Sequence, residues 1–188
     1  RKTTRLSDYK TKDYQTTMVK ALFPGTFDPI HYGHMDIARR ASRVFDEIVV
    51  AVYDKPLKSL LFEPEERIAL VRQAFAEDKK VSVMGYSGLT VEFCRKIGAQ
   101  VMVRGLRVFS DFEFEFRMAL ANHRLAEDIE IVALITAEEH TFLSSTTVRE
   151  IAMLEGNVSS MVPPFVAEAL KRKLSAGDHQ PPANALRD

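Results

Sequence analysis

The chain has 188 residues, of which 46% are apolar and 28% are charged, a composition typical of a folded globular protein. Its 26 basic residues match its 26 acidic ones, so the chain lacks the net positive charge that attracts nucleic acid or an anionic membrane, and we expect neither partner. The single cysteine, Cys94, excludes an internal disulfide and a multi-cysteine metal site, and its expected role is helix packing in a reducing compartment.

Both ends of the chain are expected to lie outside the fold. Residues 1–17 are mostly polar and charged, and we interpret them as a tag or disordered extension, while residues 175–188 are interpreted as a flexible tail. Residues 18–174 then form one domain of ordinary size. The longest apolar run, residues 48–53, is far too short to cross a bilayer.

Short runs rich in β-branched residues alternate with longer stretches of helical apolar spacing. The expected strands are residues 19–23, 47–53, 81–84, 99–103 and 130–135. The expected helices carry apolar residues at Ile37 to Phe45, Ile68 to Phe75 and Val91 to Ile97, and continue with residues 111–126, 146–154 and 165–174. This alternation predicts a Rossmann-like α/β fold, in which a doubly wound, five-stranded parallel sheet carries helices on both faces.

The stretch 111–126 is ambiguous, because Phe112, Phe114 and Phe116 alternate with glutamates as they would in a half-buried strand. Strong helix formers follow at a spacing of four, and Ser110 could cap a helix with Glu113 three residues later. We therefore predict a helix.

Ligands of open α/β sheets bind at the carboxyl ends of the strands, so the chemistry is expected in the loops that follow them. The first such loop, Pro24 to His34, contains neither a Walker A motif nor Gly-x-Gly, but it opens directly into a helix. A helix start there binds phosphate readily, Gly33 permits close approach, and His34 can donate a hydrogen bond to a phosphoryl oxygen. The alternative is that His31 and His34 form half a metal site or a simple cap.

Cations and hydroxyls gather in the other loops. Arg104 and Arg107 suit phosphate oxygens, because guanidinium is planar and permanently charged, although salt bridges to Asp111 or Glu113 are the alternative. Lys58 is either a solvated charge or a phosphate ligand. In the last loop, Ser145 or Thr146 is expected to cap a helix whose start forms a second phosphate site, which Arg149 could also reach.

The string Gly-Thr-Phe-Asp-x-x-His-x-Gly-His after a strand resembles the nucleotidylyltransferase superfamily. Further motifs narrow the resemblance to the phosphopantetheine adenylyltransferase family, and they are Lys58, Glu65-Glu66-Arg67, Arg104-Gly105-Leu106-Arg107, Asp111-Phe112-Glu113-Phe114-Glu115 and Ser144-Ser145-Thr146. The resemblance covers residues 18–174. It implies adenylyl transfer from ATP to 4'-phosphopantetheine, giving dephospho-coenzyme A and pyrophosphate without a covalent intermediate.

The resemblance also implies roles for individual residues. His34, Lys58 and Arg104 would be catalytic. Phosphopantetheine would contact Thr26, Lys58, Leu89, Thr90 and Arg104. ATP would contact Thr26, Phe27, His34, Gly105, Leu106, Arg107, Glu115, His140, Thr141, Phe142, Leu143, Ser144, Ser145 and Thr146. The family resemblance further implies a cytoplasmic homohexamer that uses Mg²⁺ without a metal site of its own residues and is inhibited by coenzyme A.

Two other functions remain open from the sequence. His31 completes a His-x-Gly-His motif, which favours a cytidylyltransferase acting on a small phosphate alcohol. A non-catalytic nucleotide-binding or coenzyme A-binding module is the second alternative, against which the presence of His34, Lys58 and Arg104 argues.

Overall fold

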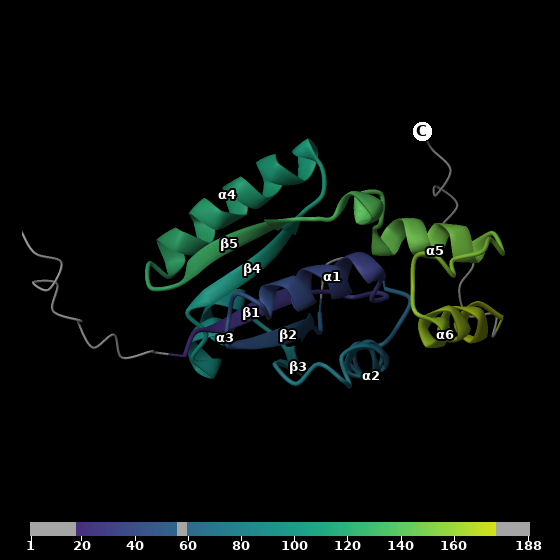
Figure 1. Cartoon of the computed structure of the whole chain (residues 1–188), viewed down its shortest axis with the longest axis horizontal. Coiled ribbons are helices and arrows are strands. Elements are labelled where there is room, and N and C mark those ends of the chain that lie inside the picture. The colour runs from purple at the N-terminus through teal and green to yellow at the C-terminus, as the bar shows by residue number, and fades with distance from the viewer. Residues whose placement is uncertain (1–17, 56–59, 176–188) are drawn as a thin grey trace, which may run out of the picture.

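The computed structural model describes residues 18–55 and 60–175, so Lys58 and both ends of the chain lie outside the described residues. Five strands form one sheet in the order β3-β2-β1-β4-β5, and every neighbouring pair is parallel (Figure 1). The strands are β1 (Lys20–Gly25), β2 (Glu47–Tyr53), β3 (Val81–Tyr86), β4 (Val101–Leu106) and β5 (Glu130–Ile135). The strand order reverses direction between β1 and β4, which is where ligands of such sheets bind.

Helices cover both faces of the sheet, which confirms the predicted doubly wound α/β fold. They are α1 (Tyr32–Ala41), α2 (Pro64–Ala74), α3 (Thr90–Ile97), α4 (Phe109–Leu125), α5 (Ser145–Met153) and α6 (Pro164–Ser175), with a short 3-10 helix η2 (Glu138–His140) before α5. The ambiguous stretch is helical, as predicted, and forms α4, the uppermost helix in Figure 1.

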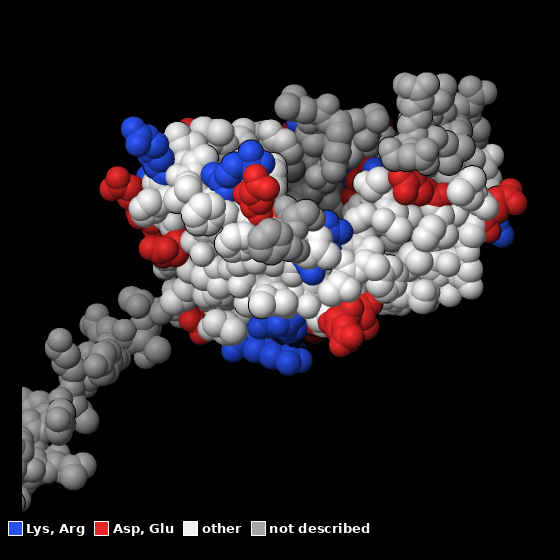
Figure 2. Space-filling model, turned by 90° about the horizontal axis from the view of Figure 1, so that it is seen from above, with Lys and Arg blue, Asp and Glu red and all other residues white. Residues whose placement is uncertain are grey.

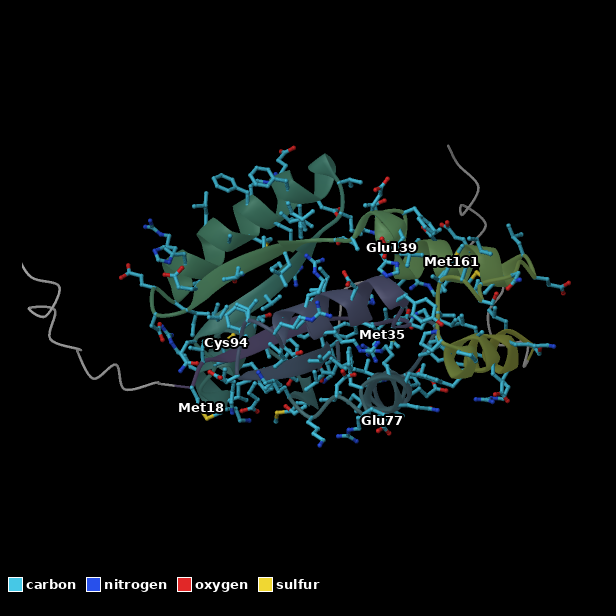
Figure 3. The ribbon with its side chains drawn as sticks, viewed as in Figure 1. Met18, Met35, Glu77, Cys94, Glu139 and Met161 are labelled. Carbon is cyan, nitrogen blue, oxygen red and sulfur yellow. The ribbon has the colours of Figure 1, made fainter. Side chains whose placement is uncertain are left out.

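The sheet has a separate apolar core on each face, because alternate residues of a strand point to opposite sides. On one face, Val50 and Met35 belong to a core that includes α1, α2, α5 and α6. On the other face, Val49 and Cys94 belong to a core built with α3, where the expected packing role of Cys94 is confirmed. Figure 3 labels Met35 and Cys94 on their respective elements.

Three strands continue two or three residues further than predicted. β1 runs to Gly25, β3 to Tyr86 and β4 to Leu106, so that Arg104 lies inside a strand and not in the following loop. The parallel ladder continues through glycines, as in the pairing of Gly105 with Leu134. A Cβ at Gly105 would lie 3.2 Å from Ile37, so this glycine permits close packing of α1 on β4 and does not end the strand.

Two expected helix features are wrong. The first helix ends at Ala41, so Val44 lies beyond it and is exposed. Helix α4 begins at Phe109 after Val108, so Ser110 does not occupy the cap position. The identity of the cap residue changes when the start of a helix shifts by one residue, and apolar spacing does not determine the start that closely. The predicted end of α3 is confirmed, because Gly98 has a φ of 69° and closes the helix in the left-handed conformation.

Charges are mixed on the face that Figure 2 shows, where basic and acidic side chains lie near one another on a largely uncharged surface. This distribution agrees with the balanced composition. Within residues 18–55 and 60–175, no helix has the length and apolar character needed to cross a membrane.

Candidate active site

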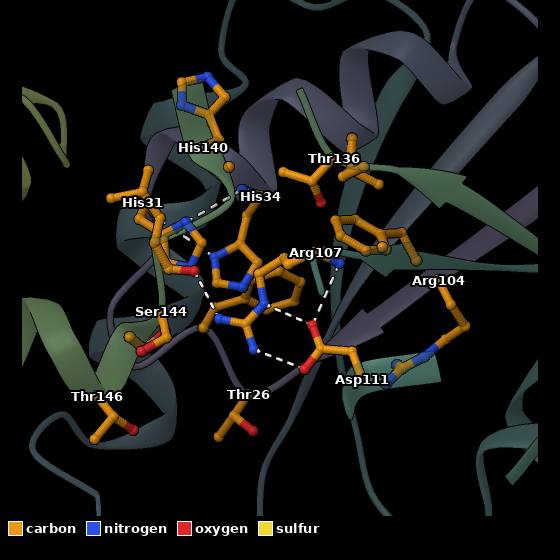
Figure 4. A pocket seen from close by; sticks show the side chains of 18 of the residues that line it. Thr26, His31, His34, Arg104, Arg107, Asp111, Thr136, His140, Ser144 and Thr146 are labelled. Atoms are coloured by element: carbon orange, nitrogen blue, oxygen red, sulfur yellow. Dashed lines mark hydrogen bonds and ion pairs between the residues drawn. The ribbon is translucent and has the colours of Figure 1, made fainter. Parts of the chain in front are cut away.

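A cleft of about 440 Å³ lies at the carboxyl ends of β1 and β4, where the strand order reverses. Its walls come from the β1–α1 loop, the start of α1, the end of β4, the first half of α4 and the segment that leads into α5. Figure 4 shows this cleft with Thr26, His34 and Arg107 facing into it. The sequence predicts the chemistry at this edge of the sheet, and the cleft lies there.

Two histidines cap the start of α1 reciprocally. The Nδ1 atom of His31 accepts the backbone N–H of His34, and the Nδ1 atom of His34 accepts the backbone N–H of His31, both at 3.3 Å. Their rings stack with centroids 3.6 Å apart, as Figure 4 shows. Because Nδ1 of His34 is an acceptor, the proton of the neutral ring is on Nε2, which is the nitrogen that can donate to a ligand.

His31 is buried and neutral. Burial is the main cause that lowers its pKa from 6.5 to about 3, and the charges of Arg107 and His140 lower it further. A Cβ at Gly33 would lie 3.1 Å from the His31 ring, so the absence of a side chain at this position leaves room for the ring. Of the two interpretations of His31, the helix cap is confirmed, and among the described residues no group of three or more His, Cys, Asp and Glu could hold a metal ion.

The Phe27 ring packs against the His34 ring. Its ring meets the imidazole edge to face, with centroids 4.9 Å apart, and the side chain is almost fully buried. Phe27 has a φ of 51°, which is unusual for a residue with a side chain. A Cβ on Gly25 would lie 2.8 Å from the Phe27 ring, so the Gly-x-Phe spacing is needed to place this aromatic ring beneath His34.

Both arginines of the Arg-Gly-Leu-Arg segment line the cleft and form ion pairs with α4. Arg104 binds both carboxylate oxygens of Glu115, at 2.8 and 2.5 Å, and the carbonyl of Pro24 at 3.1 Å. Arg107 binds Asp111 at 2.9 Å and the carbonyl of Leu143 at 2.7 Å. The alternative interpretation as salt bridges is correct for Arg107, whereas the partner of Arg104 is Glu115 and neither of the two expected carboxylates.

Helix α5 points its start into the cleft. Ser144 is the N-cap, and its Oγ accepts the backbone N–H of Thr147 at 3.0 Å, so the expected cap at Ser145 or Thr146 is wrong by one or two residues. Ser145 instead donates its hydroxyl to the carbonyl of Pro29 at 2.8 Å. The first-turn amides of a helix have no partner inside the helix, which gives this end its affinity for anions.

The structure brings most of the predicted ATP contacts together. Those that line the cleft are Thr26, Phe27, His34, Gly105, Arg107, Glu115, His140, Leu143, Ser144, Ser145 and Thr146, and Arg104 lines it as well. Leu106, Thr141 and Phe142 do not line it, although they adjoin residues that do. Lys58, predicted to be catalytic, lies outside the described residues.

A second hollow of about 260 Å³ adjoins the cleft and shares Thr26, Arg104 and Glu115 with it. It extends between α4 and β3 and has a mixed lining that includes Tyr53, Tyr86, Thr90, Met102, Met118 and Asn122. The hydroxyls of Tyr86 and Thr90 lie 3.0 Å apart, and burial raises the pKa of Tyr86. Of the predicted acceptor contacts, Thr90 lies here and Leu89 is half-exposed outside it.

Three charged residues in or next to the cleft wall had no predicted structural role. Asp28 and Arg67 are buried, and Arg149, which does not line the cleft, binds Asp28. For Arg67 a signal was available, because Arg67, Val71 and Ala74 share the buried face of α2 at helical spacing. A charged residue in a core position of a helix indicates a buried hydrogen-bond network.

The arrangement of strand, loop and helix agrees with what comparison with known proteins finds. Residues 22–151, more than half of the chain, match the family described as cytidylyltransferase-like. A solved structure from Vibrio parahaemolyticus, a putative nicotinate-nucleotide adenylyltransferase, has the same fold at a TM-score of 0.62 and 22% identity, covering 82% of this chain and 99% of the other. The class is therefore that of the nucleotidylyltransferases.

Curated relatives narrow the class further. A phosphopantetheine adenylyltransferase from Roseiflexus sp. (strain RS-1) is 53% identical over 155 residues, which cover 82% of this chain and 97% of the relative. One from Herpetosiphon aurantiacus is 51% identical over 155 residues, covering 82% and 94%. The chain belongs to the phosphopantetheine adenylyltransferase family.

Proposed function

We propose that this protein transfers the adenylyl group of ATP to 4'-phosphopantetheine, giving dephospho-coenzyme A and pyrophosphate in coenzyme A biosynthesis. Family membership supports the reaction. The observation that carries it in the structure is the cleft itself, in which a histidine at a helix start, two arginines and a second helix start surround one space.

The proposed chemistry is in-line attack of the 4'-phosphate of the acceptor on the α-phosphorus of ATP. The nucleophile is already an anion, so no general base is needed, and catalysis depends on alignment and on neutralising charge. His34 would donate from Nε2 to the transferring phosphoryl group, and Thr26 would donate beside it. Arg104 and Arg107 would offset the repulsion between the two anionic reactants, with Lys58 as a further predicted cation.

The two hollows suggest how the substrates divide the space. ATP would occupy the main cleft, with its phosphates between the starts of α1 and α5. The pantetheine arm would occupy the second hollow, whose apolar and hydroxyl-bearing lining suits an amide-containing aliphatic chain. Arg104 lines both spaces and would therefore contact the acceptor phosphate where the two substrates meet.

One assay tests the reaction directly. Pyrophosphate release is measured with ATP or CTP as donor and with phosphopantetheine or glycerol 3-phosphate as acceptor. We expect turnover with ATP and phosphopantetheine. Release with CTP alone would establish the cytidylyltransferase alternative, and nucleotide binding without any release would establish the non-catalytic module. The role of His31 as a cap accounts for its place in the motif without a cytidine-specific function.

Mg²⁺ is proposed to enter with the nucleotide and not as a metal resident in the protein. Each carboxylate that lines the cleft is already bound to an arginine, in the pairs Asp28–Arg149, Glu115–Arg104 and Asp111–Arg107. This donor set does not fit a hard cation, whose preferred ligands here are the phosphate oxygens. Titration with EDTA at constant ATP should abolish turnover and leave the melting temperature of the protein without nucleotide unchanged.

We further propose a homohexamer in the cytoplasm that coenzyme A inhibits. Assembly is supported by α4, which exposes Phe112, Phe116, Leu120 and Leu125 along its length. Light scattering should give about six times the mass of one chain, and Leu120→Asp should reduce it. Coenzyme A contains the pantetheine arm and an adenosine group, so it should compete with phosphopantetheine in the same assay.

A further inference from the structure

Asp28, in the wall of the cleft, joins three segments of the chain. Its carboxylate accepts the backbone N–H groups of Leu61 and Phe62, both at 2.9 Å, and one N–H of the Arg149 guanidinium at 3.1 Å. The same Arg149 nitrogen also donates to the backbone carbonyl of Asp28. Asp28 is 1% exposed, so these bonds form away from water, where breaking one is costly.

Arg149 brings α5 to this point from 121 positions along the chain. It lies one turn inside the helix, its side chain is only 14% exposed, and it is not among the residues that line the cleft. Ser145, at the start of the same helix, binds the carbonyl of Pro29. Two contacts therefore join the first turns of α5 to the β1–α1 loop.

Arg67 completes the arrangement from the other side. Its fully buried guanidinium donates to the carbonyls of Phe62 at 3.1 Å, Thr26 at 2.9 Å, Tyr53 at 2.6 Å and Asp54 at 3.1 Å. Phe62 thus binds Asp28 through its N–H and Arg67 through its carbonyl. The β1–α1 loop is held at Thr26 and at Asp28, on either side of Phe27.

We propose that Asp28 and Arg149 form a clamp that sets the spacing between the two phosphate-binding helix starts, those of α1 and α5. Both are positioning residues and not substrate contacts, because Arg149 does not line the cleft and its guanidinium is engaged by Asp28, while the Asp28 carboxylate is 1% exposed and would repel phosphate. The inference rests on the proposed function. A triphosphate held at both helix starts is aligned for attack only while their separation is fixed, and a misplacement of about 1 Å can cost about 10²-fold in rate.

The test combines Arg149→Met, Arg149→Lys, Asp28→Asn and the double variant Asp28→Asn/Arg149→Met. We expect Arg149→Met to lower kcat/KM for ATP by about tenfold to 10²-fold, with the KM for phosphopantetheine nearly unchanged. Arg149→Lys should restore part of the loss, because an ammonium can replace the one guanidinium nitrogen that binds Asp28 but on a shorter side chain. The double variant should be no worse than the poorer single variant, since the residues act as a pair.

Arg172→Met is the matched control, because Arg172 forms an exposed ion pair with Glu168 on α6, and it should leave all kinetic constants unchanged. Kinetics are measured well below the melting temperature of each variant. Calorimetric titration with ATP provides a second readout that does not depend on turnover. Hydrogen exchange at residues 144–147 provides a third, and should increase in Arg149→Met.

Three outcomes would overturn the clamp. The first is a lower melting temperature with wild-type kinetics and ATP affinity. The second is an equal rise in both KM values. The third is additive losses in the double variant, which would mean that Arg149 binds phosphate independently of Asp28. If the wild type binds ATP but releases no pyrophosphate, the proposed function fails, and calorimetry and exchange still decide the clamp.

Discussion

The two walls of the cleft are built differently. The loop wall, residues 24–34, is buried and holds its polar groups through internal bonds, such as the His31–His34 cap and the contacts of Asp28. The helix wall, residues 104–118, presents arginines in partly exposed ion pairs and leaves Phe112, Phe114 and Phe116 about half exposed. The polar groups of the loop wall are therefore paired within one chain. In the helix wall, a substrate could replace the carboxylate partners of the arginines, and another surface could cover the exposed phenylalanines.

The largest effect is expected at the loop wall. His34→Ala removes a donor that the neighbouring cap and the Phe27 ring hold in place, and loss of one such preorganised donor typically costs about 10²- to 10³-fold in rate. We expect a fall of that size in kcat, with both KM values changed little. Steady-state pyrophosphate release measures it. Turnover at the wild-type rate would show that the rigid wall does not contribute to the chemistry.

A smaller effect is expected at the helix wall. Arg104→Met removes a guanidinium that pairs with Glu115 and lines both hollows, and charge-assisted hydrogen bonds of this kind are worth about 1.5 to 3 kcal/mol. We expect the KM for phosphopantetheine to rise by about tenfold to 10²-fold. Arg95→Met, which breaks an exposed pair with Asp128, is the control. An unchanged KM would mean that Arg104 serves only to hold α4.

The fold was largely predictable because its signals are local. The short runs rich in β-branched residues correspond to all five strands, and Gly98 ends α3 as expected. Strand ends were less predictable, since residues such as Gly105 were interpreted as loop although their ladder continues. Cap positions depend on single hydroxyls, and Ser144 was passed over in favour of its neighbours.

The loops that form the site were predictable from the sequence, but the hydrogen bonds and ion pairs that connect them were not. Arg104 and Arg107 were expected at the cleft from their place after a strand, and they line it. The pairing of Asp28 with Arg149 spans 121 positions and follows from no periodicity or local motif. Motifs therefore located the groups that face the cleft, whereas the long-range pairs that hold those groups in place emerged only from the tertiary structure.

The next prediction concerns the pH dependence of the loop wall. The pKa of His31 is about 3 in the folded protein and about 6.5 when unfolded, so between these values the unfolded state binds one more proton. The free energy of unfolding should therefore fall as the pH drops from 6.5 toward 3, by up to about 1.4 kcal/mol per pH unit from this residue. Urea denaturation at several pH values measures the slope.

His31→Asn is the matched variant, because asparagine can still cap the helix but does not titrate. The groups that face His31 are His34, Arg107 and His140, and none of them is substituted in the variant. The slope should become shallower in His31→Asn. Equal slopes in the two proteins would show that His31 is not held neutral by burial.

The smallest effect is expected on the stability of the monomer when an exposed side chain of the helix wall is truncated. Leu120 is 58% exposed on α4, so Leu120→Ala should change the free energy of unfolding by less than about 0.5 kcal/mol at protein concentrations low enough to give monomers. Ile30, fully buried in the loop wall, is the contrast, and truncation of such a side chain to alanine costs about 2 to 5 kcal/mol.

Denaturation at increasing protein concentration extends the test of Leu120→Ala. If α4 is covered in an assembly, the stability of the wild type rises with concentration and that of Leu120→Ala rises less, because the covering surface buries the leucine. A large loss in the monomer would show instead that α4 is already packed, and that the two walls do not differ in the way their exposure indicates.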